Sequence, residues 1–428
     1  MDIDSISADL RDGANILAQH SLVQKNHALT CALEAIKKNK TNILSANAHD
    51  VANAREDGMT ESLLERLALD EKKFKSILDS MEVVIGQSDP IGEEVAGWTT
   101  PKGMQIHQVR VPLGVVAIIY ESRPNVTVDA FCLAYKSGNA ILLRGSSNAL
   151  ESNKALVAAI KEGLAQAGND GVTKAIALCE STDHADVNQI LTAVGKIDVV
   201  LPRGGAKLIN TVVENARVPV IQTGSGVCHL YVDDEADVRM AANIAQNAKM
   251  QRPGACNAIE TILVNKKVAG EFLPLLVKAF DGKVQMKADE LCYPLIEQSL
   301  KSEPYFESKP ELLARATEEN FGYEYLDLIV AIKAVDSVED AITFINAHNT
   351  KHSETIVTND RAHARLFQAQ IDAACVYVNA STRFTDGGEF GFGAELGIST
   401  QKLHARGPMG IKALTTTKFL IDGDGQIR

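Results

Sequence analysis

Short apolar runs that alternate with helical stretches constrain the fold of this chain more than any other feature of its sequence. Between residues 111 and 232 such runs are rich in Val, Ile, Leu and Ala, and stretches of helical character separate most of them. Strands that alternate with helices predict a doubly wound, mostly parallel sheet. The expected strands are 111–120, 140–143, 175–178, 198–201, 218–221 and 230–232.

The same alternation recurs after residue 258 and predicts a second α/β domain. A chain of 428 residues exceeds what one ordinary core holds, so two domains are expected in any case. A polar region separates the first of the expected strands from the rest. The strands are 259–264, 328–332, 354–358 and 374–379, and the helices are 270–280, 338–346 and 361–370.

Three further segments lie outside this alternation. Residues 9–95 carry apolar side chains at helical intervals and predict a helical N-terminal segment. Residues 104–111 alternate in the manner of an exposed or edge strand. Residues 413–421, rich in Thr, Phe, Leu and Ile, are expected to form an arm or edge strand suited to a dimer contact.

Composition excludes several classes of protein. The net charge of -12 and the lack of any run of five or more Lys and Arg argue against a nucleic-acid partner. The first residues carry no basic and apolar leader, and no apolar run reaches membrane-spanning length, so we expect a cytoplasmic protein without a membrane partner. Seven cysteines without paired spacings favour reduced thiols. The sequence has no CxxC or HExxH arrangement, and we expect no metal site.

Three loops at the ends of expected strands combine small residues with an arginine. They are residues 121–125, 144–147 and 202–207. Each alone is better explained by an ordinary turn with a solvated arginine. Together they favour a phosphate-bearing nucleotide cofactor, because backbone N–H groups at helix starts and arginines both bind phosphate. Neither GxGxxG after the first strand nor GxxxxGK[ST] is present, so the site is neither an ordinary Rossmann fingerprint nor a P-loop.

Cys256 follows a Pro-Gly turn and precedes an expected strand. In the stretch 249–257, Pro253 and Gly254 break a helical run just before this cysteine. A turn that leads into a strand presents its side chains to a substrate, which favours Cys256 as a nucleophile at the junction of the two domains. The competing interpretation is a buried structural thiol, because free cysteine is among the most buried residue types.

Motifs spread over nearly the whole chain resemble the aldehyde dehydrogenase superfamily, and within it the branch that reduces a glutamyl phosphate. The weakest coverage runs from about residue 268 to 324. The motifs are 110–115, 120–127, 202–205, 251–257, 348–354, 378–384 and 401–410.

The resemblance implies an aldehyde-dehydrogenase-like α/β fold of two doubly wound domains plus a small oligomerisation arm. Residues 1–232 would bind NADPH, with 98–112 as part of the arm. Residues 233–400 would form the catalytic domain containing Cys256, and 401–428 a C-terminal segment with an oligomerisation strand. A homo-oligomer, either a dimer or a tetramer, is implied.

The activity implied by the resemblance is NADPH-dependent reduction of L-glutamyl 5-phosphate to L-glutamate 5-semialdehyde and phosphate, the second step of proline biosynthesis from glutamate. It also implies a functional link to glutamate 5-kinase. Cys256 would form a thioester, and Asn125 would stabilise the oxyanion together with the backbone N–H of Cys256. No base that activates the thiol is evident in the sequence.

Binding residues are likewise implied by the resemblance. Ser147 stands where NAD-preferring members often carry a glutamate, which favours NADPH. An arginine of the substrate site would bind the phosphoryl group or the α-carboxylate, and both assignments stay open. Expected cofactor residues are Arg144, Gly145, Ser146, Ser147, Pro202, Arg203, Gly204, Gly205, Gly224 and Glu324. Expected substrate residues are Arg123, Ser381, Thr382 and Arg383.

One departure from the wider superfamily is informative. Hydrolytic members carry a glutamate in a Glu-Leu-Gly-Gly pattern, whereas the corresponding residues 222–226 here are Gln-Thr-Gly-Ser-Gly. No carboxylate stands there to activate water. Two alternatives remain: a cysteine acyltransferase or hydrolase with a histidine base near Cys256, and a catalytically silent binding protein. His352 and His404 lie in family motifs, and structural roles are expected for both.

Overall fold

The computed structural model describes residues 2–181 and 183–428, and the chain divides into two compact units. Unit 1 consists of Met1–Thr223, Gly391–Gly397 and Leu403–Arg428. Unit 2 consists of Gly224–Phe390 and Ile398–Lys402. Among the described residues, no helix is both long enough and apolar enough to cross a membrane.

Unit 1 contains a four-stranded parallel sheet in the order β5-β4-β3-β6. Its central strands are continuous Val, Ile and Leu runs that are buried on both faces, as expected of a parallel sheet covered by helices. The strands are β3 (Val115–Tyr120), β4 (Ala140–Arg144), β5 (Ile176–Leu178) and β6 (Val199–Arg203).

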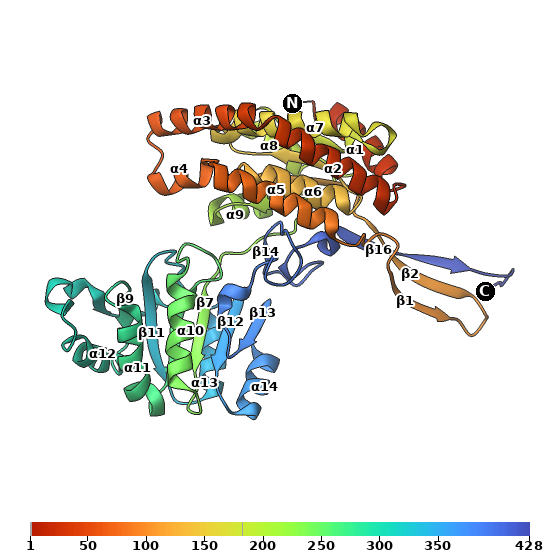
Figure 1. The fold of residues 1–428 in the computed structure, drawn as a ribbon. Coiled ribbons are helices and arrows are strands. Elements are labelled where there is room, and N and C mark those ends of the chain that lie inside the picture. Colours follow the sequence, from red (N-terminus) through yellow and green to blue (C-terminus); the bar gives the residue numbers. More distant parts are fainter. Residues whose placement is uncertain (1, 182) are drawn as a thin grey trace. The chain divides into compact units, whose positions relative to one another are not determined.

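Helices surround this sheet (Figure 1). The helical N-terminal segment is confirmed, and Ser21 opens its second helix with a capping box to Gln24. The helices of unit 1 are α1 (Ile3–Leu17), α2 (Leu22–Lys38), α3 (Lys40–Glu56), α4 (Glu61–Leu67), α5 (Glu71–Gly86), α6 (Asn125–Lys136), α7 (Leu150–Gln166), α8 (His184–Leu191) and α9 (Ala206–Asn215).

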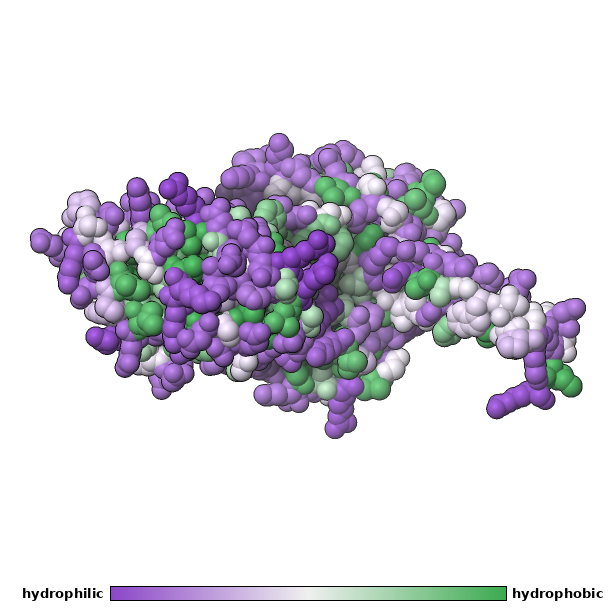
Figure 2. Space-filling model, turned by 90° about the horizontal axis from the view of Figure 1, so that it is seen from below, coloured by the Kyte–Doolittle hydropathy of each residue, from purple (hydrophilic) through white to green (hydrophobic). Residues whose placement is uncertain are grey.

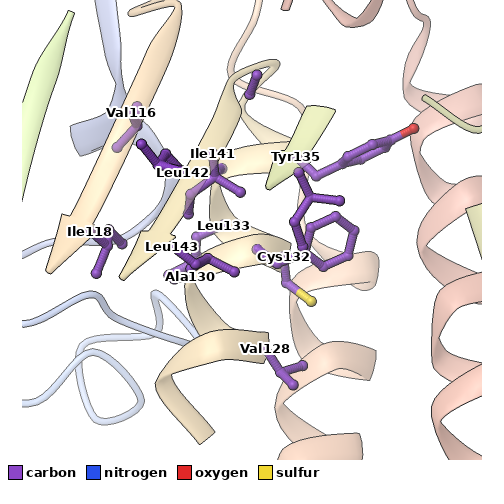
Figure 3. Close-up of a cluster of buried hydrophobic side chains, with 14 of the residues drawn as sticks. Val116, Ile118, Val128, Ala130, Cys132, Leu133, Tyr135, Ile141, Leu142 and Leu143 are labelled. Carbon is purple, nitrogen blue, oxygen red and sulfur yellow. The ribbon is translucent and has the colours of Figure 1, made fainter. Parts of the chain in front are cut away.

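The core of unit 1 forms where α6 packs on β3 and β4. Figure 3 shows side chains of the helix and of both strands directed into one cluster. Phe131 and Tyr135 are buried in it, with ring centroids 5.4 Å apart. Because α6 begins immediately after the loop at 121–124, this packing fixes the position of one of the three expected cofactor loops.

The segment 218–221 does not form the expected strand. It makes one isolated bridge, between Val200 and Val220. Pro219 lies within the segment and has no N–H to donate, so a regular ladder cannot continue through it.

A three-stranded antiparallel arm completes unit 1. Its strands are β1 (Glu94–Thr99), β2 (Gln105–Pro112) and β16 (Thr415–Asp422), in the order β1-β2-β16. The strand expected near the C-terminus is therefore present, paired with β2 over its whole length. Trp98, Phe419 and Ile421 are among its exposed hydrophobic residues, and Figure 2 shows pale and green residues along the arm, at the right.

Unit 2 contains a seven-stranded parallel sheet in the order β10-β9-β11-β8-β7-β12-β13. The two units therefore confirm the predicted doubly wound α/β class. The strands are β7 (Cys228–Val232), β8 (Ile259–Asn265), β9 (Gln285–Ala288), β10 (Leu313–Arg315), β11 (Ile329–Val335), β12 (Ser353–Val357) and β13 (Cys375–Val378). The helices are α10 (Val238–Met250), α11 (Lys266–Phe280), α12 (Cys292–Leu300), α13 (Val338–His348) and α14 (Arg361–Gln370). Two short strands, β14 (Ile398–Ser399) and β15 (Gly407–Pro408), follow.

Two features of unit 2 differ from the sequence-based expectation. The sequence predicts that the strand at 230–232 belongs to the first domain, but β7 lies between β8 and β12 in the sheet of unit 2. Its register, which pairs Cys228 with Ile259, continues the hydrophobic layer of that sheet. The polar region also contains β9, α12 and β10, which the sequence does not predict. The strands β9 and β10 are only four and three residues long, too short for a clear apolar pattern.

A fully buried ion pair joins the end of α10 to the start of β8. Lys249 Nζ lies 2.6 Å from Glu260 Oε2, and both side chains are 0% exposed. Burial raises the pKa of Glu260 to about 7 and lowers the pKa of Lys249, because water no longer solvates either charge. The eleven-residue separation of the partners encloses the loop that carries Cys256.

We expect Lys249→Met to lower the free energy of unfolding by about 3–5 kcal/mol, since it leaves Glu260 buried without a counter-charge. Urea-induced unfolding measures the change. The loss grows as pH rises through about 7, the pKa of Glu260 in the wild type, because Lys249 favours the ionised form of Glu260 and its removal raises that pKa further. Adding Glu260→Leu restores much of the stability.

The control is Lys301→Met, which removes an exposed pair with Glu297 and costs less than about 1 kcal/mol. Equal effects of the two lysine substitutions would contradict a structural role for the buried pair.

Candidate active site

The loop between α10 and β8 presents Cys256. Ala255 N donates to Arg252 O and Ala258 N to Ala255 O, so the Pro253-Gly254 segment forms consecutive tight turns around the cysteine. Cys256 is partly exposed, and among the seven cysteines only Cys31 shares this property while the others are buried. The exposed position expected for a nucleophile is thus present within unit 2.

Gly226 lies against the backbone of Cys256. A Cβ atom added at Gly226 would overlap the Cys256 carbonyl oxygen and lie 2.9 Å from its Cα, so no other residue fits without displacing the loop. Cys228 Sγ donates to the same carbonyl oxygen at 3.2 Å. In residues 222–226 the sequence signals are the missing carboxylate and the expected cofactor residue Gly224, and neither indicates this close packing at Gly226.

Glu324 holds Gly226 in place. Its Oε1 accepts a hydrogen bond from Gly226 N at 2.7 Å, and burial raises its pKa. The role expected for Glu324, contact with a cofactor, stays a prediction. Gly224, the other expected cofactor residue of unit 2, donates its N–H to Ile398 O, and a Cβ there would overlap Thr400.

The expected substrate residues 381–383 are tied to the residue that follows Cys256. Thr382 Oγ1 donates to Asn257 O at 2.6 Å, and the Arg383 guanidinium donates to Asn257 Oδ1. Asn257 Nδ2 in turn donates to Thr385 O at 2.9 Å. The structure therefore brings these residues together with the nucleophile loop.

Of those three residues, Arg383 is the one that lines a cavity. Ser381 and Thr382 are buried and bond within the protein, with Ser381 Oγ accepting from Arg383 N. Arg383 Nε donates to Gln251 Oε1 at 2.9 Å and borders a cavity of about 200 Å³. Its charge also interacts with Cys256, and a nearby guanidinium favours the thiolate form of a cysteine.

In unit 1, the three expected cofactor loops meet at the carboxyl ends of β3, β4 and β6. Ser122 Oγ lies 3.1 Å from Ser146 Oγ, which joins the first two loops. Gly205 N donates to Glu121 Oε2 at 2.9 Å, which joins the first and third. Arg123 and Gly204 belong to the same loops, whereas Pro202 and Arg203 are the last two residues of β6.

Arg144, in the second of these loops, has a hydrogen-bond donor without a partner in the part of the chain that the structure describes. Its Nε atom is buried and has no hydrogen-bond partner among the described residues. Gly145 follows, where a Cβ would overlap Asn153 Nδ2, and Ser147 begins a short 3-10 turn. A partly exposed guanidinium whose buried Nε–H has no partner among the described residues fits an anionic group of a nucleotide.

Asn125 begins α6 within unit 1, whereas Cys256 belongs to unit 2. Asn125 Nδ2 donates to Asp129 Oδ2 at 3.1 Å, and burial raises the pKa of Asp129. The amide is thereby oriented by its own helix, and its joint action with Cys256 stays a prediction.

The two histidines of the motifs bond to structural partners. His352 is buried, with Nδ1 2.8 Å from Ser353 Oγ and 3.8 Å from Cys228 Sγ. His404 Nε2 lies 2.6 Å from Ala413 O.

One group of metal-compatible side chains occurs among the described residues, consisting of Asp233, Asp234 and His363. Asp233 already accepts hydrogen bonds from Tyr231 and Thr358 and contacts His363 Nδ1 at 2.7 Å, and Asp234 pairs with Lys267. Protein partners account for the arrangement.

Comparison with known proteins places these features in a family. The model of the aldehyde dehydrogenase family matches residues 2–299 and 309–419. A gamma-glutamyl phosphate reductase from Moorella thermoacetica is 52% identical over 98% of this chain and 96% of its own, and one from Lachnospira eligens is 48% identical over 100% and 99%.

A solved structure agrees with the sequence matches. The crystal structure of gamma-glutamyl phosphate reductase from Thermotoga maritima has a TM-score of 0.94 with 44% identity, and the match covers 100% of both chains. On these matches, the chain belongs to the aldehyde dehydrogenase family, and within it to the gamma-glutamyl phosphate reductases.

Proposed function

We propose that this chain reduces L-glutamyl 5-phosphate to L-glutamate 5-semialdehyde and phosphate with NADPH, the second step of proline biosynthesis from glutamate. The relatives named gamma-glutamyl phosphate reductase support this activity over the full length of the chain. The observation that carries it is the partly exposed Cys256, held between Gly226 and the Arg383 loop.

In this reaction the Cys256 thiolate attacks the acyl carbon, the bond from that carbon to the phosphate oxygen breaks, and phosphate leaves. The product is a thioester on Cys256. A nicotinamide, when bound, supplies the hydride that reduces this acyl group. The carbon–sulfur bond then breaks, the aldehyde leaves, and the thiolate of Cys256 is restored.

Oxyanion stabilisation is assigned to Asn125 and the backbone N–H of Cys256. The bond from Asn125 to Asp129 uses one N–H of the amide and leaves the second for an oxyanion. One such donor typically contributes roughly 3–4 kcal/mol to transition-state stabilisation.

The sequence of residues 222–226 favours reduction of the thioester by hydride over its hydrolysis by water. It contains no carboxylate, so it provides no base for water near the thioester. The competing acyltransferase or hydrolase requires a histidine base at Cys256, and the full-length relatives are named as reductases instead. These features favour the reductase.

Enzymes of this family use NAD or NADP, and we assign NADPH here. The unpaired Nε of Arg144 supports an anionic ligand at the loops of unit 1, and the uncharged Ser147 is compatible with a 2′-phosphate. The remaining proposed cofactor contacts are Gly145, Ser146, Pro202, Arg203, Gly204, Gly205, Gly224 and Glu324.

The proposal also covers assembly and location. The exposed apolar residues of the arm support a homo-oligomer, a dimer or tetramer, because such side chains gain by being buried. Seven free cysteines suit the reducing cytoplasm. A glutamate 5-kinase would supply the acyl phosphate.

For the substrate, Arg123 and Arg383 are the two candidate arginines, and Ser381 and Thr382 shape the loop that carries Arg383.

The nucleophile is tested in the reverse direction, by following NADP+ reduction with glutamate 5-semialdehyde and phosphate. We expect Cys256→Ser to lower kcat by at least about 10³-fold, since it removes the group that bonds to the acyl carbon. The control is Cys31→Ser, the other partly exposed cysteine, which keeps full activity. Phosphate-independent turnover, or a fully active Cys256→Ser enzyme, would refute the mechanism.

Gly226→Ala is expected to lower kcat by about 10²-fold, because the added methyl group displaces Cys256 from its attacking position. Gly270→Ala is the matched control, since a Cβ there meets nothing within 4 Å. Circular dichroism and kcat are measured for both variants. If both glycine variants keep wild-type kcat, the packing of Gly226 has no catalytic role.

Cofactor preference is tested at Ser147. Ser147→Glu places a carboxylate where the 2′-phosphate is expected, and like-charge repulsion should weaken NADPH binding at least about tenfold relative to NADH. Fluorescence titration with each nucleotide measures the change without turnover. Ser147→Gln controls for size, and equal NADPH affinity of the Glu and Gln variants would contradict this assignment.

A further inference from the structure

A small cavity in unit 2 carries both signs of charge. Its volume is about 200 Å³, and its lining residues are Asn247, Gln251, Arg383, Phe384, Asp386 and Glu389. We propose that this cavity binds the α-carboxylate and α-ammonium groups of the substrate, with Arg383 bound to the carboxylate and Asp386 and Glu389 bound to the ammonium. The inference rests on the proposed function and assigns the amino-acid end of its substrate.

The cavity is tied directly to the nucleophile loop. Arg383 bonds to Asn257, the residue after Cys256, and to Gln251, the residue after α10. Asn257 also holds the loop from its other side through Thr385 O. We therefore place the remaining groups of a substrate whose acyl carbon reaches Cys256 against this cavity wall.

Arg383 keeps donors for a ligand. A guanidinium has five N–H groups, and the bonds to Gln251 and Asn257 account for two of them. Those two bonds fix the plane of the guanidinium, so that its remaining N–H groups are oriented before substrate binds.

The two acidic residues of the cavity belong to one turn, which the Asp386 carboxylate holds together. Asp386 Oδ1 accepts from Gly388 N at 2.8 Å and from Glu389 N at 3.3 Å. Phe390 N donates to Asp386 O at 3.0 Å, which closes the turn. Asp386 and Glu389 therefore face the cavity from one short segment, and Arg383 and Gln251 from other parts of the wall.

The charges of the lining residues indicate which end of the substrate this cavity binds. A phosphoryl group carries negative charge and would meet two carboxylates for one guanidinium in this cavity. A zwitterion offers a carboxylate to Arg383 and an ammonium to Asp386 and Glu389, so every charge finds an opposite partner. The open choice between phosphoryl and carboxylate at Arg383 is thus resolved in favour of the carboxylate. Arg252 also interacts with Arg383 and adds to the positive side.

The test compares two aldehydes in the reverse assay with NADP+ and phosphate: glutamate 5-semialdehyde and 5-oxopentanoate, which lacks only the amino group. We expect wild type to prefer the amino-acid aldehyde in kcat/KM. The double variant Asp386→Asn with Glu389→Gln should lower that preference about tenfold or more, through KM, because it removes the charge that pairs with the ammonium. Glu319→Gln, an exposed glutamate outside the cavity, is the control and keeps the wild-type ratio.

Calorimetric titration with L-glutamate and with glutarate gives a second measurement without turnover. We expect wild type to bind L-glutamate more tightly than glutarate, and the double variant to lose most of that difference. An unchanged preference in the folded double variant, or no preference in wild type, overturns the cavity assignment. If wild type lacks phosphate-dependent turnover but its preference for L-glutamate depends on Asp386 and Glu389, the proposed reaction fails while the binding site stands.

Discussion

The geometry of the candidate site depends on the buried ion pair between Lys249 and Glu260. These residues flank the loop that carries Cys256, and their 2.6 Å contact joins the two ends of that loop inside unit 2. A buried pair of this kind contributes little to stability compared with a well-packed apolar pair, yet loss of one partner is costly. Its value here is positional, because a loop whose ends are fixed has fewer conformations to sample.

Packing and hydrogen bonds then position the cysteine within the closed loop. Gly226 allows one backbone segment to lie directly on the carbonyl of Cys256, and Glu324 holds that segment through the Gly226 N–H. On the other side, Asn257 links the loop to residues 382–385. The thiol is therefore placed by backbone contacts on two sides, and such contacts position a side chain more tightly than exposed ion pairs do.

The parts of this structure that follow local rules could be predicted from the sequence. The long apolar runs at β3, β8 and β11 and the turn before Cys256 have period and composition as signals. The prediction for β7 names the wrong sheet. An apolar run indicates that a strand is buried, but it does not indicate which strands lie beside it. The role of Gly226 could not be predicted either, because it depends on a contact with Cys256, thirty residues further along the chain. A single sequence contains no signal of that contact.

Glu121 changes how the glycine-containing loops of unit 1 are best interpreted. The sequence predicts that N–H groups at the start of α9 donate to phosphate, but Gly205 N already donates to the Glu121 carboxylate. A phosphate there would have to displace that carboxylate and would be repelled by it. The Nε atom of Arg144, by contrast, is buried without a partner among the described residues. An unpaired buried donor gains most from a new acceptor, so Arg144 is a better candidate than the helix start for the proposed contact with an anionic cofactor group.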